Sequence, residues 1–303
     1  MGRPESEAGG RKVVDVIPTL QTLKAQDVAG RTAVVVDILR ATSTIVTALA
    51  AGAREIRPAV SPREARARYL RLEAALGGRD GLLLGGERFG LRIEGFDLGN
   101  SPLEYTPERV AGKTIVFSTT NGTRTLRRAA GRRSEPSGAA ARVLVASFLN
   151  ATAVAERLAD LGGDVVVACA GTRGGFSLED ILMAGLLVDY LQRRARDGED
   201  LVFRDLARAA AALYRAMAGE SGENLARAIV SADHARYLSS LGFGADVARC
   251  ATRDLTDIVP EYRAGRVTVP GRVTVPGRVT VSGRVTVSGR VTAPGPGRRE
   301  SGS

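Results

Sequence analysis

The stretch Thr32-Ala-Val-Val-Val-Asp-Ile-Leu-Arg-Ala-Thr-Ser-Thr44 contains the unit from which the chain is built. It opens with a short run of apolar, mainly β-branched residues, which is typical of a buried strand. Small polar residues follow, and the apolar stretch Ile45–Ala51 then predicts a helix that Gly52 can terminate. A strand that passes through a polar turn into a helix is the building block of parallel α/β folds.

The same order of strand, polar turn and helix recurs along the chain. Further predicted strands are Thr114–Ser118, Arg142–Phe148 and Asp164–Ala170, each followed by small polar residues and a helix-forming segment. Such alternation places helices on both faces of one sheet. The sequence therefore predicts the α/β class, as a three-layer α/β/α fold with a mainly parallel or mixed sheet.

Length and composition fit one folded domain with two unstructured ends. The 303 residues are 44% apolar and 25% charged, which are ordinary values for a globular protein. We assign residues 12–264 to the folded domain and predict a disordered leader over the polar, Gly-rich residues 1–11. From Gly265 the chain repeats Gly-Arg-Val-Thr-Val with Pro or Ser at a six-residue period, which leaves little apolar surface to bury. We therefore expect residues 265–303 to be a disordered tail.

The net charge of +10 suggests a nucleic-acid partner until its distribution is considered. Residues 266–303 contain seven Arg and one Glu, or +6, which leaves +4 for the preceding 265 residues. We therefore expect no nucleic-acid partner for the folded part. A cationic tail that contacts nucleic acid or anionic lipid is the alternative.

Membrane segments and cysteine clusters are not indicated. No run approaches the roughly 18–20 apolar residues of a membrane span, and the N-terminus carries no secretion signal, so we expect a cytoplasmic protein without a membrane partner. Cys169 and Cys250 lie far apart, which predicts neither a disulfide nor a zinc site, and Cys169 is expected to be a buried strand residue. A homodimer is compatible with these features.

Polar residues follow each predicted strand. In open α/β sheets, ligands bind at the carboxyl ends of strands, beside helix N-termini that favour anions. The residues expected along this rim are Asp37, Asn121, Asn150 and Thr172, with hydroxyl donors from Thr42, Ser43, Thr44, Thr120 and Thr123. Each of these residue types is also an ordinary helix cap, but four clusters together favour a site for a phosphorylated, multiply charged ligand.

The motifs of common nucleotide sites and hydrolases are missing. The sequence has no Gly-x-x-x-x-Gly-Lys-[Ser/Thr], no Gly-x-Gly-x-x-Gly after a strand and no Gly-x-Ser-x-Gly. His234 is the single histidine, and it could act as an acid or base, bind an anion, or be structural.

Carboxylates supply the remaining candidate chemistry. Asp37 at the end of a buried strand would be costly without donors or a cation, and Mg²⁺ prefers such oxygen ligands. The other candidate acids are Glu87, Glu94, Asp97, Glu179 and Asp180. Ser177-Leu-Glu-Asp180 also resembles a capping box, so capping and chemistry both stay open for its two acids.

Several motifs, in order and spacing, resemble the 2-phosphosulfolactate phosphatase family over about residues 12–260. They are Val36-Asp-Ile-Leu-Arg-Ala-Thr-Ser-Thr44, Gly86-Glu-Arg88, Gly95-Phe-Asp-Leu-Gly-Asn-Ser-Pro102, Thr119-Thr-Asn-Gly-Thr-Arg124, Ser147-Phe-Leu-Asn150, Cys169-Ala-Gly-Thr172, Phe176-Ser-Leu-Glu-Asp180 and Ser231-Ala-Asp-His-Ala-Arg-Tyr-Leu238. The chain departs from the family pattern at Phe89 and Ala235, where Gly is expected.

The resemblance implies Mg²⁺-dependent hydrolysis of (2R)-2-phospho-3-sulfolactate to sulfolactate and phosphate, a step of coenzyme M biosynthesis in methanogens. We assign Asp37, Glu87 and Asp180 as catalytic, and Asp37, Glu87 and Glu179 as magnesium ligands. The residues assigned to substrate binding are Arg40, Thr42, Ser43, Thr44, Arg88, Asn100, Ser101, Thr120, Asn121, Gly122, Thr123, Arg124, Asn150 and Thr172. Among them, the arginines suit planar contacts with anions.

The sequence is compatible with two mechanisms and with two other functions. Magnesium can activate a water for in-line attack, or Asp37 can itself attack the phosphorus. The first is favoured because Leu39 stands where aspartyl-phosphate phosphatases carry a second Asp. The alternative functions are a phosphatase of another small anionic organic phosphate and a non-catalytic anion-binding relative.

Overall fold

The structure, a computed structural model, describes residues 11–131, 138–195, 200–219 and 221–272. Within these residues one sheet contains eleven strands in the order β5-β4-β6-β3-β11-β10-β7-β2-β8-β1-β9. The strands are β1 (Lys12–Ile17), β2 (Thr32–Val36), β3 (Glu55–Pro58), β4 (Leu82–Arg88), β5 (Leu91–Arg92), β6 (Thr114–Ser118), β7 (Arg142–Ala146), β8 (Val165–Cys169), β9 (Leu201–Phe203), β10 (Glu261–Arg263) and β11 (Arg266–Thr268).

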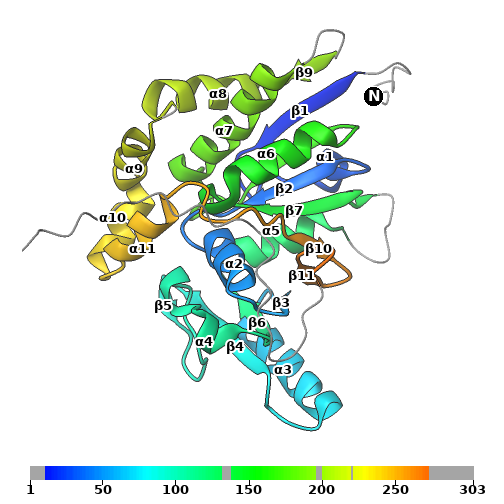
Figure 1. The fold of residues 1–303 in the computed structure, drawn as a ribbon, viewed down its shortest axis with the longest axis vertical. Coiled ribbons are helices and arrows are strands. Elements are labelled where there is room, and N and C mark those ends of the chain that lie inside the picture. The colour runs from blue at the N-terminus through cyan, green and yellow to red at the C-terminus, as the bar shows by residue number, and fades with distance from the viewer. Residues whose placement is uncertain (1–10, 132–137, 196–199, 220, 273–303) are drawn as a thin grey trace, which may run out of the picture.

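Helices lie on both sides of this sheet (Figure 1). The α-helices are α1 (Ala25–Val28), α2 (Ala41–Ala50), α3 (Pro62–Leu76), α4 (Pro107–Val110), α5 (Gly122–Ala129), α6 (Ala151–Asp160), α7 (Leu178–Arg194), α8 (Asp205–Met217), α9 (Gly222–Val230), α10 (Asp233–Ser240) and α11 (Gly244–Cys250), with 3-10 helices η1 (Pro102–Glu104) and η3 (Phe148–Asn150). Among the described residues, no helix is long and apolar enough to cross a membrane.

Two blocks of parallel strands make up most of the sheet. One contains β4, β6 and β3, and the other contains β7, β2, β8, β1 and β9. The β10–β11 hairpin joins them, because β10 pairs antiparallel with β7 and β11 pairs antiparallel with β3. These successive antiparallel pairings make the two blocks run in opposite directions along the sheet. The predicted α/β class with a mainly parallel or mixed sheet is confirmed.

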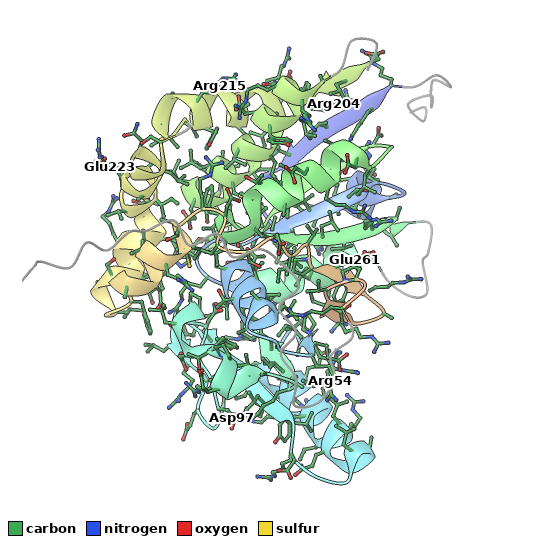
Figure 2. All side chains as sticks on the ribbon, viewed as in Figure 1. Arg54, Asp97, Arg204, Arg215, Glu223 and Glu261 are labelled. Carbon is green, nitrogen blue, oxygen red and sulfur yellow. The ribbon has the colours of Figure 1, made fainter. Side chains whose placement is uncertain are left out.

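The central strands bury both of their faces. In β2, Val34 and Val36 join an apolar cluster with α6, α7 and α8, whereas Ala33 and Val35 join a second cluster with α2 and α5. Charged side chains such as those of Arg204 and Glu223 lie on the outside of the helical layer (Figure 2).

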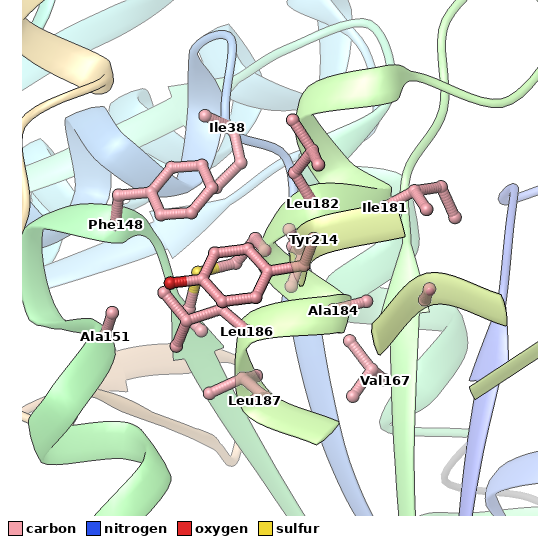
Figure 3. Packing of buried hydrophobic residues seen from close by; sticks show 14 of the residues in the cluster. Ile38, Phe148, Ala151, Val167, Ile181, Leu182, Ala184, Leu186, Leu187 and Tyr214 are labelled. Carbon is pink, nitrogen blue, oxygen red and sulfur yellow. The ribbon is translucent and has the colours of Figure 1, made fainter. Parts of the chain in front are cut away.

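Figure 3 shows the interior of the first cluster, to which α7 contributes most of one helix face. Full burial of each large apolar side chain is worth about 1.5–3 kcal/mol, so the two clusters stabilise the three-layer arrangement. Cys169 is buried in β8, as predicted.

The first repeat of the tail belongs to the fold. Arg266–Thr268 forms β11, and Val267 is fully buried in the second cluster. The predicted boundary at residue 264 is therefore wrong, because one Val-Thr-Val unit finds a place between β3 and β10 where its apolar side chain is covered. The predicted disorder of the leader and of the later repeats concerns residues 1–10 and 273–303, which lie outside the described residues.

Two truncations separate the structural part of the tail from the rest. A chain ending at Arg272 is expected to keep its unfolding temperature. A chain ending at Arg263 loses β11 and Val267, and we expect its unfolding free energy to fall by about 2 kcal/mol or more. Thermal and urea unfolding measure both values. Equal stability of the two truncated chains would contradict a structural role for β11.

Candidate active site

A cavity of ≈ 970 Å³ lies where the carboxyl ends of strands from both blocks converge. After the strands of the first block it is lined by Glu87, Phe89 and Gly90 of β4 and its loop and by Thr119–Asn121 after β6. The second block contributes Asp37, Leu39 and Arg40 after β2 and Gly171–Asp180 after β8, and the α10 region adds Ser231–His234, Tyr237 and Leu238. Because the blocks run oppositely along the sheet, a flat sheet would place these ends on opposite edges. In this structure both sets of strand ends nevertheless contribute residues to one cavity.

Asp37 lies between β2 and α2, and its carboxylate faces the cavity. Its Oδ1 accepts the Ala41 N–H at 3.2 Å, and a Cβ at position 122 would lie 2.7 Å from its Oδ2. The pKa of Asp37 is raised from 3.8 to about 6, chiefly by burial and also by the charges of Glu87 and Glu179, while the Ala41 N–H and the charge of His234 oppose the shift. Gly122 is thus needed for close approach rather than for contact with a ligand.

Asp180 and Glu87 hold the surrounding loops. Asp180 accepts the N–H of Ile38 at 2.8 Å and the N–H of Gly171 at 3.1 Å, which joins the ends of β2 and β8. Glu87 accepts the N–H of Thr120 at 2.7 Å and that of Gly90 at 2.9 Å. Burial raises the pKa of Asp180 well above its ordinary value, as do the charges of Glu179 and Asp37. Both acids already use both oxygens, so they position other groups.

Glu179 differs from these two acids because one of its oxygens is unused. It is almost fully buried, its Oε1 lies 3.3 Å from His234 Nδ1, and its Oε2 has no hydrogen-bond partner among the described residues. His234 Nδ1 also lies 3.1 Å from Thr172 Oγ1, which contacts Ser177 Oγ at 2.7 Å. Ser177 makes no side-chain cap to α7, so the capping alternative for this segment is not observed.

The three predicted magnesium ligands line the same cavity. In the part of the chain that the structure describes, however, no three His, Cys, Asp or Glu side chains form a group that could hold a metal ion. Both carboxylate oxygens of Glu87 accept backbone N–H groups instead of forming a ligand group with the other two acids. A metal here would therefore rely on one or two carboxylates.

Some predicted substrate-binding residues line the cavity: Arg40, Asn100, Thr120, Asn121 and Thr172. The others, which are Thr42, Ser43, Thr44, Arg88, Ser101, Gly122, Thr123, Arg124 and Asn150, are not among its lining residues.

The buried hydroxyl groups donate to backbone carbonyls and to one buried carboxylate. Thr42, Ser43 and Thr44 donate to the carbonyl oxygens of Asp37, Ile38 and Asn100 at 2.9, 2.9 and 2.8 Å. Thr123 Oγ1 likewise donates to the Thr119 carbonyl at 3.2 Å, and Ser101 Oγ donates to Asp246 Oδ1 at 2.6 Å. These hydroxyl groups donate to backbone and core acceptors and do not line the cavity, so their assignment to substrate stays a prediction.

Asn150 and two of the predicted arginines also lie outside the cavity lining. Asn150 is buried, accepts the Ser147 N–H and donates to the carbonyls of Val145 and Ile258. Arg88 donates to Ser118, and burial lowers its pKa. Arg124 is exposed on α5 outside the cavity.

Arg40 lines the cavity but is committed to the core. It is 2% exposed, pairs with Asp246 at 2.6 Å, donates to the Gly90 carbonyl and lies 4.1 Å from the Phe243 ring centroid. The paired residues are 206 positions apart in the sequence. Nothing in the local motif distinguishes such an arginine from one that contacts substrate.

Arg173 is the cavity arginine that the motif analysis missed. It is exposed in the loop after β8, and its guanidinium lies 4.8 Å from the Tyr237 ring centroid. The sequence signal that could have indicated this residue is its position in a Gly-rich turn, between Thr172 and Gly174-Gly175, directly after a strand. Phe89 and Phe176 lie at the same cavity with 80% and 62% exposure.

The fold and this cavity define an α/β protein with an enzyme-like ligand site at the carboxyl ends of its strands. A family model described as 2-phosphosulpholactate phosphatase matches residues 17–265. The chain therefore belongs to the 2-phosphosulfolactate phosphatase family, a family of phosphoric monoester hydrolases, and the resemblance seen in the sequence is confirmed.

Curated relatives agree with this assignment. A protein named probable 2-phosphosulfolactate phosphatase from Clostridium beijerinckii is 36% identical over 255 residues, covering 84% of this chain and 98% of the relative. The protein of the same name from Symbiobacterium thermophilum is 43% identical over 246 residues, covering 81% and 97%. That from Thermotoga petrophila is 46% identical over 231 residues, covering 76% and 88%.

The raised pKa of Asp37 predicts that this residue lowers the unfolding free energy as the pH rises. Between about pH 4 and 6 the folded chain retains a proton that the unfolded chain has lost, so stability falls as the pH rises. Asp37→Asn removes this cost, and without divalent cations it should gain roughly 1–3 kcal/mol relative to the parent chain between pH 4 and 7.

Urea unfolding at several pH values measures that difference. Asp205→Asn, on an exposed residue of α8, is the matched control and should show no such trend. A pH-independent difference between Asp37→Asn and the parent chain would contradict the raised pKa.

The buried pair of Arg40 and Asp246 gives a second prediction. Arg40→Met leaves Asp246 buried without its cation, and the unfolding free energy should fall by about 3–5 kcal/mol. The double variant Arg40→Met, Asp246→Leu should recover most of this loss. Arg227→Gln breaks an exposed pair with Glu223 and is expected to cost under about 1 kcal/mol. A double variant as unstable as Arg40→Met would show that the ion pair is not the cause.

Proposed function

We propose that this chain is a Mg²⁺-dependent phosphatase that hydrolyses (2R)-2-phospho-3-sulfolactate to (2R)-3-sulfolactate and phosphate. The observation that carries the proposal is the cavity at the converging strand ends, with its buried carboxylates. The names of the family model and of the relatives support the phosphate ester as the reacting group.

The charge of the cavity supports a cation. The substrate carries a phosphate, a sulfonate and a carboxylate, and it would meet Asp37 and Glu179 in a buried environment. Mg²⁺ is satisfied by one or two carboxylates together with phosphate oxygens, and the unpartnered Glu179 Oε2 is a suitable donor. Asp37 and Glu179 would hold the ion, and bound Mg²⁺ would stabilise negative charge on the phosphoryl group.

The remaining residues bind and orient. Asp180 and Glu87 fix the loops that carry Gly171 and Thr120 through hydrogen bonds to their N–H groups. Arg173 supplies a guanidinium without an ion pair among the described residues, and we assign it to the sulfonate.

Water is the nucleophile in this proposal, as favoured by Leu39 in place of a second Asp. Attack on phosphorus breaks its bond to the C2 oxygen, and that oxygen leaves with a proton as the sulfolactate hydroxyl. No phosphorylated peptide containing Asp37 should then accumulate under acid quench, and trapping one would replace water by Asp37.

A phosphate-release panel tests the function. Phosphosulfolactate, phospholactate and phosphoglycolate are compared with Mg²⁺ and with chelator, and only phosphosulfolactate with Mg²⁺ should turn over efficiently. Arg173→Gln should raise KM for phosphosulfolactate about tenfold and change KM for phospholactate less, because phospholactate has no sulfonate.

The controls separate substrate binding from general damage. Arg227 is also a cation, but it is exposed on α9 and does not line the cavity. Arg227→Gln should therefore leave both KM values unchanged. No turnover of any ester, despite retained anion binding, would favour the non-catalytic relative. Equal turnover with chelator would contradict the dependence on Mg²⁺.

A further inference from the structure

A second cavity, of ≈ 530 Å³, lies where β3 and β6 begin. Its walls are the start of β3, Thr114 at the start of β6, the end of α3, and residues 266–272 from β11 onward. The candidate active site lies beyond the carboxyl end of β6, so the two cavities are at opposite ends of this strand. The volume is in the range of small-molecule sites.

The lining of the second cavity is strongly basic. It contains Arg54, Arg57, Arg266 and Arg272 against the single acid Glu55, which gives a formal charge of +3. Four guanidinium groups around one cavity repel one another, and a bound anion would relieve that repulsion. Two of these arginines come from the repeats of the tail.

A hydrogen-bond network holds the arginines in place. Glu55 is 7% exposed, and its Oε1 accepts from Arg57 Nε at 2.7 Å and from Thr114 Oγ1 at 3.1 Å. Thr114 Oγ1 in turn accepts from Arg54 Nε and Nη2 at 3.1 and 2.9 Å, and Arg266 Nη1 lies 3.5 Å from Glu55 Oε2. The guanidinium groups of Arg54, Arg57 and Arg266 are therefore positioned before any ligand arrives (Figure 2 labels Arg54).

These contacts leave many donors unused. A guanidinium group has five N–H donors, and the network employs Nε and Nη2 of Arg54, Nε of Arg57 and Nη1 of Arg266. Arg272 Nη1 donates separately to the Leu49 carbonyl at 2.7 Å. Among the described residues, the two Nη groups of Arg57, Nη1 of Arg54 and Nη2 of Arg266 have no hydrogen-bond partner. Paired donors of this kind match the oxygens of phosphate groups.

We propose that this cavity binds a diphosphate group, either free or as part of a small organic diphosphate. The arginines would take the diphosphate oxygens. Leu72 and Leu76 of α3 line one side, and Leu76 is 55% exposed, so an organic substituent has an apolar surface to cover. The proposal does not depend on the phosphatase function, because it uses other residues at the other end of β6.

Calorimetric titration of the full chain with pyrophosphate, ADP and inorganic phosphate tests the proposal. Pyrophosphate should bind at least about tenfold more tightly than phosphate, because it engages more guanidinium groups. Tighter binding of ADP than of pyrophosphate would assign an organic diphosphate, and the reverse would assign the free ion.

Variants locate the binding site. Arg57→Gln and Arg266→Gln should each weaken pyrophosphate binding about tenfold. Arg57→Lys should weaken it less, because lysine keeps the positive charge but lacks the paired N–H donors of the guanidinium group. Arg266 is half exposed, so its variant should fold even if loss of Arg57 from the Glu55 network lowers stability. Arg208→Gln, on an exposed arginine of α8, is the matched control with unchanged affinity. Thermal unfolding confirms that each variant is folded.

Two results would overturn the proposal. Unchanged affinity in Arg57→Gln and Arg266→Gln, together with competitive inhibition of phosphate release by pyrophosphate, would place the anion in the candidate active site. Binding of oligonucleotides without binding of pyrophosphate would indicate a nucleic-acid surface instead. Calorimetry needs no turnover, so failure of the phosphatase proposal would leave this test intact.

Discussion

A buried carboxylate needs hydrogen-bond donors, and in this protein the backbone N–H groups at strand ends supply them. Asp180 receives two such groups, from the residues that follow β2 and β8. Glu87 receives two more, from the loops after β4 and β6. Each acid thereby fixes two loops within its own block of strands. Loss of either would leave N–H groups without partners in the floor of the cavity.

Contacts between the blocks then close the cavity. Asn121 Nδ2 donates to the Gly171 carbonyl at 2.9 Å, which ties the loop after β6 to the loop after β8. Arg40 reaches across to the Gly90 carbonyl and is held by Asp246 of α11. The β10–β11 hairpin joins the blocks through the sheet itself. The site therefore exists only when both blocks are in place, although each block could pair its own strands alone.

The sequence predicted the units of this fold well and their assembly poorly. The strand at Thr32–Val36 and the helix that follows are local features, set by apolar runs and polar turns, and both are observed. The opposite direction of the two blocks depends on a hairpin whose second strand lies inside a low-complexity repeat. No local pattern could indicate that one repeat is buried while composition predicts disorder.

The site shows the same division between local and distant causes. The motifs correctly placed Asp37, Glu87, Glu179 and Asp180 around one cavity. They could not show that the hydroxyl of Thr42 donates to the Asp37 carbonyl just before α2, or that Arg40 pairs with an acid 206 residues away. Residues within a shared motif can therefore serve the core or the ligand, and only their partners tell which.

The state of each carboxylate oxygen offers a physical criterion for function. In Asp180 and Glu87 both oxygens accept backbone N–H groups, so these oxygens are already engaged in holding the loops. Glu179 has a buried oxygen without a donor among the described residues, and the Asp37 carboxylate, whose pKa is raised to about 6 chiefly by burial, accepts the Ala41 N–H. Uncompensated charge is stable only if a proton or a cation balances it. The same four acids thus divide into two that hold the loops of the cavity through both oxygens and two that accept fewer hydrogen bonds from the described residues.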